Sequence, residues 1–297
     1  MKPPRFQYLA PRSLEQAIAL LDEHGPDARI LAGGQSLVPM LNFRLLAPKV
    51  LMDINRLPSM DLIDAHDDVL SFGALVRHRI VETSTLVSER VPVLSAAMRH
   101  VAHLAIRNRG TIAGSLCHAD PAAELPAIAV LTEAQIRVVG PEGRRTIDAQ
   151  TFFEGPLSTS LNADELVHGV DIPVTDGFAG WGFDEVARRS GDFAIAGAGA
   201  LVATDSSGVR DVRICVFGVG DTPMRAKTAE DLLRNSRFEP EAIDAASEAV
   251  MAMLNPYDDL HGSADYRRHL AGGLTRRVCR AAWHRSQGQP DTSLRLK

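Results

Sequence analysis

Two short segments rich in small residues place the strongest constraint on the fold of this chain. The first, ILAGGQSLVPM, spans Ile30 to Met40, and the second, IRNRGTIAGSLCHADPAAELP, spans Ile106 to Pro126. Small residues let a backbone approach a ligand closely, and consecutive backbone N–H groups can hold an anion. The pair therefore indicates a binding site for an elongated ligand that contains phosphate.

The Gly33-Gly34 pair of the first segment fits two structural roles. The commoner role is an ordinary strand-to-helix turn, in which glycine adopts a positive φ. The other is a turn that holds phosphate, to which Gln35 and Ser36 would add amide and hydroxyl groups. The segment has neither the Gly-Lys-Ser/Thr ending of a Walker loop nor the GxGxxG dinucleotide fingerprint. These residues alone leave both roles open.

The second segment offers further candidates for contact with a ligand. Arg107 and Arg109 are able to bind phosphate, although a surface ion pair is the commoner role of a single arginine. Hydroxyls and close backbone approach come from Thr111, Gly114 and Ser115. Glu124 opens a predicted helix, where a carboxylate suits the helix dipole. It could equally accept hydrogen bonds from ribose or ribityl hydroxyls.

Composition excludes several classes of protein. The 297 residues, 45% of them hydrophobic, are enough for two domains. The net charge of -5, without any run of Lys or Arg, argues against binding to nucleic acid. The three cysteines are far apart, so they predict neither a metal site nor an iron–sulfur cluster, and they fit a reducing compartment. Without a signal-like or membrane-length apolar run, we expect a soluble cytoplasmic protein.

Hydrophobic periodicity predicts an α+β chain whose second half differs from its first. In the first half we expect strands over 6–8, 28–32, 50–54, 69–72 and 165–172, and a hairpin over 135–139 and 145–147. Helices are expected from a capping box at Ser13 and Gln16 to Gly25, and over 83–87, 93–104 and 125–131. In the second half, an antiparallel meander over 181–187, 198–204 and 212–219 precedes helices over 228–233, 240–253 and 264–283.

Four motifs in this order resemble the FAD-binding medium subunit of the molybdenum hydroxylases. That family includes aerobic carbon monoxide dehydrogenase, xanthine dehydrogenase and bacterial N-heterocycle hydroxylases. The motifs are the opening FQYLAPRSLEQAIALL, the AGGQSL turn, the stretch IRNRGTIAGSLCHADPAAELPA, and FDEVARR with the nearby DFA. The ending DDLHGSADYRRHLAGGLTRR is also similar. The resemblance covers nearly the whole chain.

The resemblance implies a two-domain α+β architecture. A PCMH-type FAD-binding domain would span residues 1–176 in two lobes, about 1–56 and 57–176. A domain like the carbon monoxide dehydrogenase flavoprotein C-terminal domain would span 177–285, with a three-stranded antiparallel sheet and helices. Residues 286–297 would form a flexible tail.

The resemblance also implies which residues bind FAD. They are Ala32, Gly33, Gly34, Gln35, Ser36 and Leu37 on one wall, and Thr111, Ala113, Gly114, Ser115, Asp120 and Glu124 on the other. Glu124 stands where the family often has Asp and would bind sugar hydroxyls. No residue is expected to act as a catalytic acid or base, because the flavin carries the electrons.

One residue departs from the family pattern Thr-x-Gly-Gly. The chain reads Thr111-Ile112-Ala113-Gly114, with Ala113 in place of the first glycine. An alanine is tolerated where φ is negative, whereas a position that needs positive φ would shift the turn and weaken its contacts with pyrophosphate. Because Gly114 is retained, we expect FAD binding to survive.

The resemblance implies an electron-relay subunit. It would accept electrons from two [2Fe-2S] clusters of a small partner subunit and pass them through FAD to an external acceptor. A large partner subunit would hold the molybdenum cofactor, and the whole would be a dimer of heterotrimers. Two alternatives are a free-standing flavin oxidoreductase of the same fold and a non-enzymatic assembly module, which only Ala113 favours.

Overall fold

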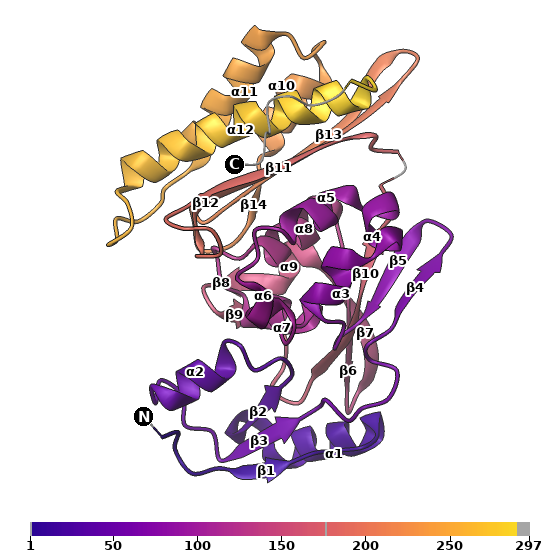
Figure 1. Ribbon diagram of the computed structural model, residues 1–297, viewed down its shortest axis with the longest axis vertical. Helices are drawn as coiled ribbons and strands as arrows, with labels where there is room; N and C mark the ends of the chain where they lie inside the picture. The colour runs from indigo at the N-terminus through magenta and orange to yellow at the C-terminus, as the bar shows by residue number, and fades with distance from the viewer. Residues whose placement is uncertain (1, 176, 290–297) are drawn as a thin grey trace.

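The computed structural model describes residues 2–175 and 177–289 and consists of three parts stacked along one long axis (Figure 1). A small lobe with α1, α2 and three strands forms one end. A larger sheet with helices α3 to α9 forms the middle. A second sheet, covered by α10 to α12, forms the other end. The predicted domain boundary at residue 176 and residues 290–297 of the predicted tail lie outside the described residues.

The small lobe is a three-stranded parallel sheet with strand order β1-β3-β2. Its elements are β1 (Gln7–Leu9), α1 (Leu14–His24), η1 (Gly25–Asp27), β2 (Ala28–Leu31), α2 (Leu37–Asn42) and β3 (Val50–Asp53). Ser13 caps α1, because its Oγ accepts a hydrogen bond from the Gln16 N–H at 3.2 Å. The Gln16 side chain instead accepts from the Arg12 N–H, so only half of the predicted capping box forms.

The middle part is a five-stranded antiparallel sheet with strand order β4-β5-β10-β6-β7. Its strands are β4 (Ile63–His66), β5 (Val69–Gly73), β6 (Gln135–Gly140), β7 (Gly143–Asp148) and β10 (Leu166–Pro173). The helices are α3 (His78–Thr83), α4 (Thr85–Arg90), α5 (Pro92–Ala97), α6 (Leu104–Arg107), α7 (Ile112–His118), α8 (Glu124–Thr132) and α9 (Ala149–Phe152). A small ribbon pairs β8 (Phe153–Gly155) with β9 (Ser158–Thr159).

The helix predicted over 93–104 is wrong, because the chain turns between α5 and α6. Ala102 has a left-handed backbone, with φ of +45°. The Arg107 Nη1 donates hydrogen bonds of 2.8 Å to the carbonyl oxygens of both Val101 and Ala102. A side chain from beyond the turn therefore satisfies carbonyls that a continuous helix would have bonded internally.

The C-terminal part contains the predicted antiparallel meander with one strand more than predicted. The strands are β11 (Gly180–Ala187), β12 (Ala194–Asp205), β13 (Gly208–Phe217) and the two-residue β14 (Met224–Arg225), in that order. Helices α10 (Lys227–Arg234), α11 (Pro240–Met253) and α12 (Ala264–Ser286) cover one face, where Ala196, Ala198 and Ala200 are buried. The other face contributes Phe183 and Phe217 to the core of the middle part. Helix α12 ends at Ser286, the first residue of the predicted tail.

The contact between α12 and the sheet depends on Gly182 of β11. A Cβ at this position would overlap the carbonyl oxygen of Val278 in α12. We predict that Gly182→Ala lowers the free energy of unfolding by about 1–3 kcal/mol, because the helix must move away from the strand. Urea unfolding monitored by circular dichroism measures the change.

Gly273 provides the matched control within α12, because a Cβ there meets no atom within 4 Å. Gly273→Ala should raise the free energy of unfolding by about 0.5–1 kcal/mol, since alanine is the better helix former. Equal effects of the two substitutions would contradict the proposed packing.

Candidate cofactor site

The first glycine turn joins the end of β2 to the start of α2. Gly34 has φ of +73°, which favours glycine, and the Gln35 Nε2 donates to the Gly33 carbonyl at 3.0 Å. Within residues 2–175 and 177–289, no backbone carbonyl accepts a hydrogen bond from the N–H groups of Gly34, Gln35 or Ser36. The turn therefore presents three consecutive donors that are available to an anion.

The second glycine turn leads into α7. Thr111 is buried and caps this helix, because its Oγ1 accepts a hydrogen bond from the Gly114 N–H at 3.2 Å. Ala113 lies inside the helix and is buried, and it is not among the described residues with positive φ. The departure from the family pattern therefore stands at a position whose backbone accepts alanine.

His78 contacts the backbone of the second turn at two carbonyl groups. Its backbone N–H donates to the Gly110 carbonyl, and its Nε2 lies 2.9 Å from the Thr111 carbonyl oxygen. Burial lowers the pKa of His78 to about 4, so the ring is neutral at neutral pH. Because a carbonyl only accepts, the Nε2 must carry the proton of the neutral ring.

The two turns touch each other. A Cβ at Gly33 would lie 2.5 Å from the Arg109 carbonyl oxygen and 2.9 Å from the Gly110 Cα. A Cβ at Gly114 would lie 3.8 Å from the Ala32 Cβ. The segments that the sequence separates by about seventy residues thus form one site, and only glycine fits at position 33.

Asn55 and Arg77 connect the two turns, although sequence reasoning missed both. The Asn55 Nδ2 donates to the Ala32 carbonyl at 2.8 Å, and the Arg77 Nη2 donates to the Asn55 Oδ1 at 2.6 Å. The Arg77 Nη1 also donates to the Arg109 carbonyl. Asn55 could have been found from its position just beyond β3, since β2 and β3 are parallel and their carboxyl ends share an edge.

The two candidate arginines of the second segment differ in their surroundings. Arg107 forms an ion pair with Glu82, with its Nε 3.0 Å from the Glu82 Oε2, and it also closes the turn before α6. Its guanidinium is thus already engaged in the fold. Arg109 is exposed, and its carbonyl rather than its side chain takes part in the contact between the turns.

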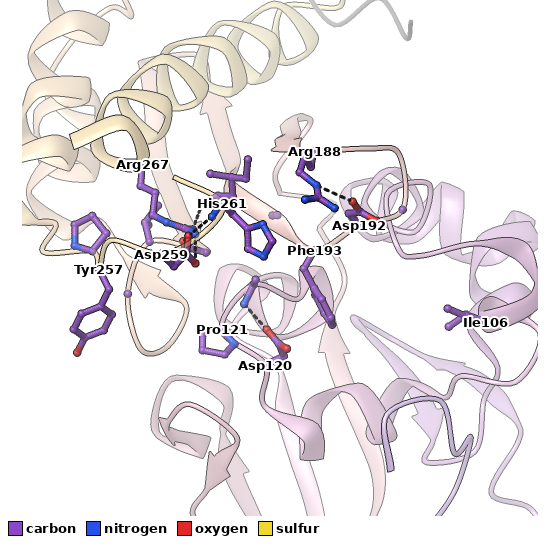
Figure 2. Close-up of a pocket in the computed structure, with 18 of the residues that line it drawn as sticks. Ile106, Asp120, Pro121, Arg188, Asp192, Phe193, Tyr257, Asp259, His261 and Arg267 are labelled. Carbon is purple, nitrogen blue, oxygen red and sulfur yellow. Dashed lines mark hydrogen bonds and ion pairs between the residues drawn. The ribbon is translucent and has the colours of Figure 1, made fainter. Parts of the chain in front are cut away.

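Asp120 lines a cleft of about 730 Å³ between the end of the second segment and the C-terminal part. Figure 2 shows Asp120 and Pro121 below Asp259, His261 and Arg267, with Tyr257 on the left and Phe193 on the right of the view. Arg267 forms an ion pair with Asp259, with its Nη2 2.6 Å from the Asp259 Oδ2. The Gly218 N–H donates to the Pro121 carbonyl at 2.9 Å, so the C-terminal part fixes the loop of Asp120.

Glu124 lies at the junction of the middle and C-terminal parts and does not line this cleft. It is 5% exposed, and burial together with the nearby carboxylate of Glu185 raises the pKa of Glu124 to about 8. The Glu185 Oε1 lies 3.5 Å from the His100 Nδ1. The Glu185 Oε2 is buried and has no hydrogen-bond partner among the described residues. A contact of Glu124 with sugar hydroxyls stays a prediction.

No group of three or more His, Cys, Asp or Glu side chains in residues 2–175 and 177–289 is arranged to hold a metal ion. In the same part of the chain, no helix is both long and apolar enough to cross a membrane.

Comparisons with known proteins identify the family. The FAD binding domain in molybdopterin dehydrogenase matches residues 4–175, and the CO dehydrogenase flavoprotein C-terminal domain matches residues 181–282. The chain belongs to the FAD-binding medium-subunit family of the molybdenum hydroxylases. Membership confirms the resemblance inferred from the four motifs and the α+β fold expected from it.

Relatives cover almost the full length of the chain. The 6-hydroxypseudooxynicotine dehydrogenase complex subunit alpha of Paenarthrobacter nicotinovorans is 41% identical over 288 residues, 97% of each chain. The structure of carbon monoxide dehydrogenase from Hydrogenophaga pseudoflava superposes with a TM-score of 0.93 at 38% identity, covering 96% of this chain and 99% of that one. Quinoline 2-oxidoreductase from Pseudomonas putida 86 gives a TM-score of 0.92 at 38% identity, with the same coverage.

The residues at the two turns fit the diphosphate of FAD. The first turn supplies three consecutive N–H donors and a glycine with positive φ, and it packs against the residues that lead into α7. An anion is stabilised by such donors because each N–H directs a partial positive charge toward it. Among the predicted contacts, Ala32 to Leu37 and Thr111 to Ser115 are brought together, whereas Asp120 and Glu124 stand apart from them.

We predict that Gly33→Ala weakens FAD binding about 10- to 100-fold, because its methyl group would separate the two turns. Ala113→Gly should not strengthen binding, and it should lower the free energy of unfolding by about 0.5–1 kcal/mol, since glycine is unfavourable inside a helix. Fluorescence titration of the FAD-free protein and urea unfolding measure the two quantities. Tighter FAD binding by Ala113→Gly would show that this position limits affinity.

The buried carboxyl of Glu124 should make the stability of the fold depend on pH. The raised pKa of Glu124 means that folding favours its protonated form, so this stabilisation is present at acidic pH and is lost as the pH rises through about 8. Glu124→Gln should therefore become more stable than the wild type with rising pH, by on the order of 1–3 kcal/mol at pH 9.

Urea unfolding at pH 6 and pH 9 measures this difference. Glu89→Gln, an exposed position on α4, serves as the control and should show no such trend. A stability difference between Glu124→Gln and the wild type that stays constant with pH would contradict the prediction.

Proposed function

We propose that this chain is the FAD-binding medium subunit of a heterotrimeric molybdenum hydroxylase. It accepts electrons from iron–sulfur clusters of a partner subunit and passes them through FAD to an external acceptor. The contact of Gly33 with Arg109 carries the proposal, because it joins the two turns into one anion site. Membership of the family supports the same activity.

Each part of the site has a separate task in this proposal. The N–H groups of Gly34 to Ser36 and the first turn of α7 hold the diphosphate. Asp120 and Glu124 accept hydrogen bonds from sugar hydroxyls. FAD, when bound, supplies the redox chemistry, which the protein side chains do not have. Phe193 and Tyr257, which are 59% and 67% exposed at the cleft, offer apolar surfaces against a flat ring system.

The proposal assigns the other redox centres to partner subunits. The three cysteines are free, with Cys117 exposed and Cys215 and Cys279 buried, so they do not form a cluster site. A large subunit would hold the molybdenum cofactor and a small one two [2Fe-2S] clusters, in a dimer of heterotrimers. The unpaired cysteines also support a cytoplasmic location. In this proposal the FAD-binding domain spans residues 1–176 and the C-terminal domain spans residues 177–285.

The chain purified alone should carry the flavin absorption bands, and heating should release a chromophore that co-migrates with FAD on chromatography. After FAD removal, the protein should bind added FAD in a 1:1 ratio. FMN serves as the control ligand and should bind more weakly, because it lacks the diphosphate and the adenosine. A folded, colourless chain that takes up neither compound would contradict the proposal.

A further inference from the structure

The two turns of the FAD site belong to different lobes and are joined by side chains as well as by close packing. The first turn follows β2 of the parallel sheet, and the second leads into α7, which packs against β10 of the antiparallel sheet. Arg77 stands between them, just before α3, and its backbone pairs with that of Thr111. We infer that Arg77 is the positioning residue that fixes the geometry of both turns for FAD, an inference that rests on the proposed function.

The two terminal nitrogens of the Arg77 guanidinium donate to different acceptors. The Nη1 donates to the carbonyl of Arg109, the group against which Gly33 packs. The Nη2 donates to the Asn55 Oδ1 at 2.6 Å. A planar fork of this kind holds two acceptors in one fixed arrangement, which the single ammonium group of lysine does not do. Arg77 thus sets the distance between the second turn and Asn55.

Asn55 connects Arg77 to the first turn through a hydrogen bond to the Ala32 carbonyl. Its Nδ2 donates to the Ala32 carbonyl at 2.8 Å. In a trans peptide the C=O and the following N–H point in opposite directions, so fixing the Ala32 carbonyl also fixes the direction of the Gly33 N–H. The hydrogen bond therefore orients a peptide plane at the start of the anion-binding turn.

Asn55 is itself held by the small lobe. The Asp53 Oδ1 accepts from the Asn55 N–H at 2.9 Å and from its Nδ2 at 2.6 Å. The Tyr8 hydroxyl donates to the Asp53 Oδ2 at 2.6 Å. Burial alone would raise the pKa of Asp53, but the hydrogen bonds from Tyr8 and Asn55 outweigh it and lower that pKa. The network Tyr8–Asp53–Asn55–Arg77 thus runs from β1 to the second lobe.

The test uses the FAD-free full-length chain and the variants Arg77→Gln, Arg77→Lys and Asn55→Ala. Arg77→Gln should weaken FAD binding about 10- to 100-fold, because a charge-assisted hydrogen bond to each of two groups is lost. Arg77→Lys should recover part of the affinity. The double variant Arg77→Gln/Asn55→Ala should bind little worse than either single variant, since both disrupt one network.

Hydrogen exchange in the FAD-free chain separates this inference from the proposed function. Arg77→Gln should speed exchange of the Val38 and Met40 amides, which donate to the Gly34 and Ser36 carbonyls of the first turn, and leave the C-terminal sheet unchanged. If the wild type failed to bind FAD, the proposed function would be wrong, and faster exchange of the Val38 and Met40 amides in Arg77→Gln would still support the network. Unchanged FAD affinity and unchanged exchange in Arg77→Gln would overturn the inference.

Arg79→Ala is the matched control, because Arg79 lies two positions further along the chain, inside α3, and its side chain pairs only with Glu82 among the described residues. It should bind FAD like the wild type. If Arg77→Gln does not fold, Arg77→Lys and Asn55→Ala decide the question. Wild-type affinity in both would overturn the inference, and weakened affinity in both would support it.

Discussion

The contact between Gly33 and the Arg109 carbonyl is the constraint on which the rest of the site depends. It brings the end of a parallel strand in one lobe against the start of a helix in another. At 2.5 Å from that carbonyl there is no room for any Cβ, so a side chain at position 33 would move the lobes apart. The three free N–H groups of the first turn are thereby placed beside the residues that lead into α7, and the hydrogen bonds of Asn55 and Arg77 hold the two segments in that arrangement.

Ion pairs join the C-terminal part to the end of α8. The Glu133 carboxylate at the end of α8 binds Arg213 and Arg225 of the C-terminal sheet, each at 3.0 Å. Because Arg225 also pairs with the buried Glu230, these charges form a network rather than isolated surface pairs. The network therefore holds the end of α8 against the C-terminal sheet, while the Gly218 N–H holds the loop of Asp120 through the Pro121 carbonyl.

Sequence reasoning identified the elements with strong local signals and missed those that depend on distant contacts. Glycine turns, alternating strands and the apolar α8 carry their signal within a few residues. The break between α5 and α6 depends on Arg107 reaching back to two carbonyls, which no pattern at 93–104 reveals. Asn55 and Arg77 escaped notice for a similar reason, since their partners lie 23 and 32 residues away.

The glycines of a binding motif are required for different physical reasons, and the motif alone does not distinguish them. Gly33 is required by the lack of space, and Gly34 by its positive φ. The position of Ala113 has neither requirement, because it is an ordinary buried position in the first turn of α7. The departure from Thr-x-Gly-Gly therefore leaves the anion site intact, and it gives no support to a module that has lost its cofactor.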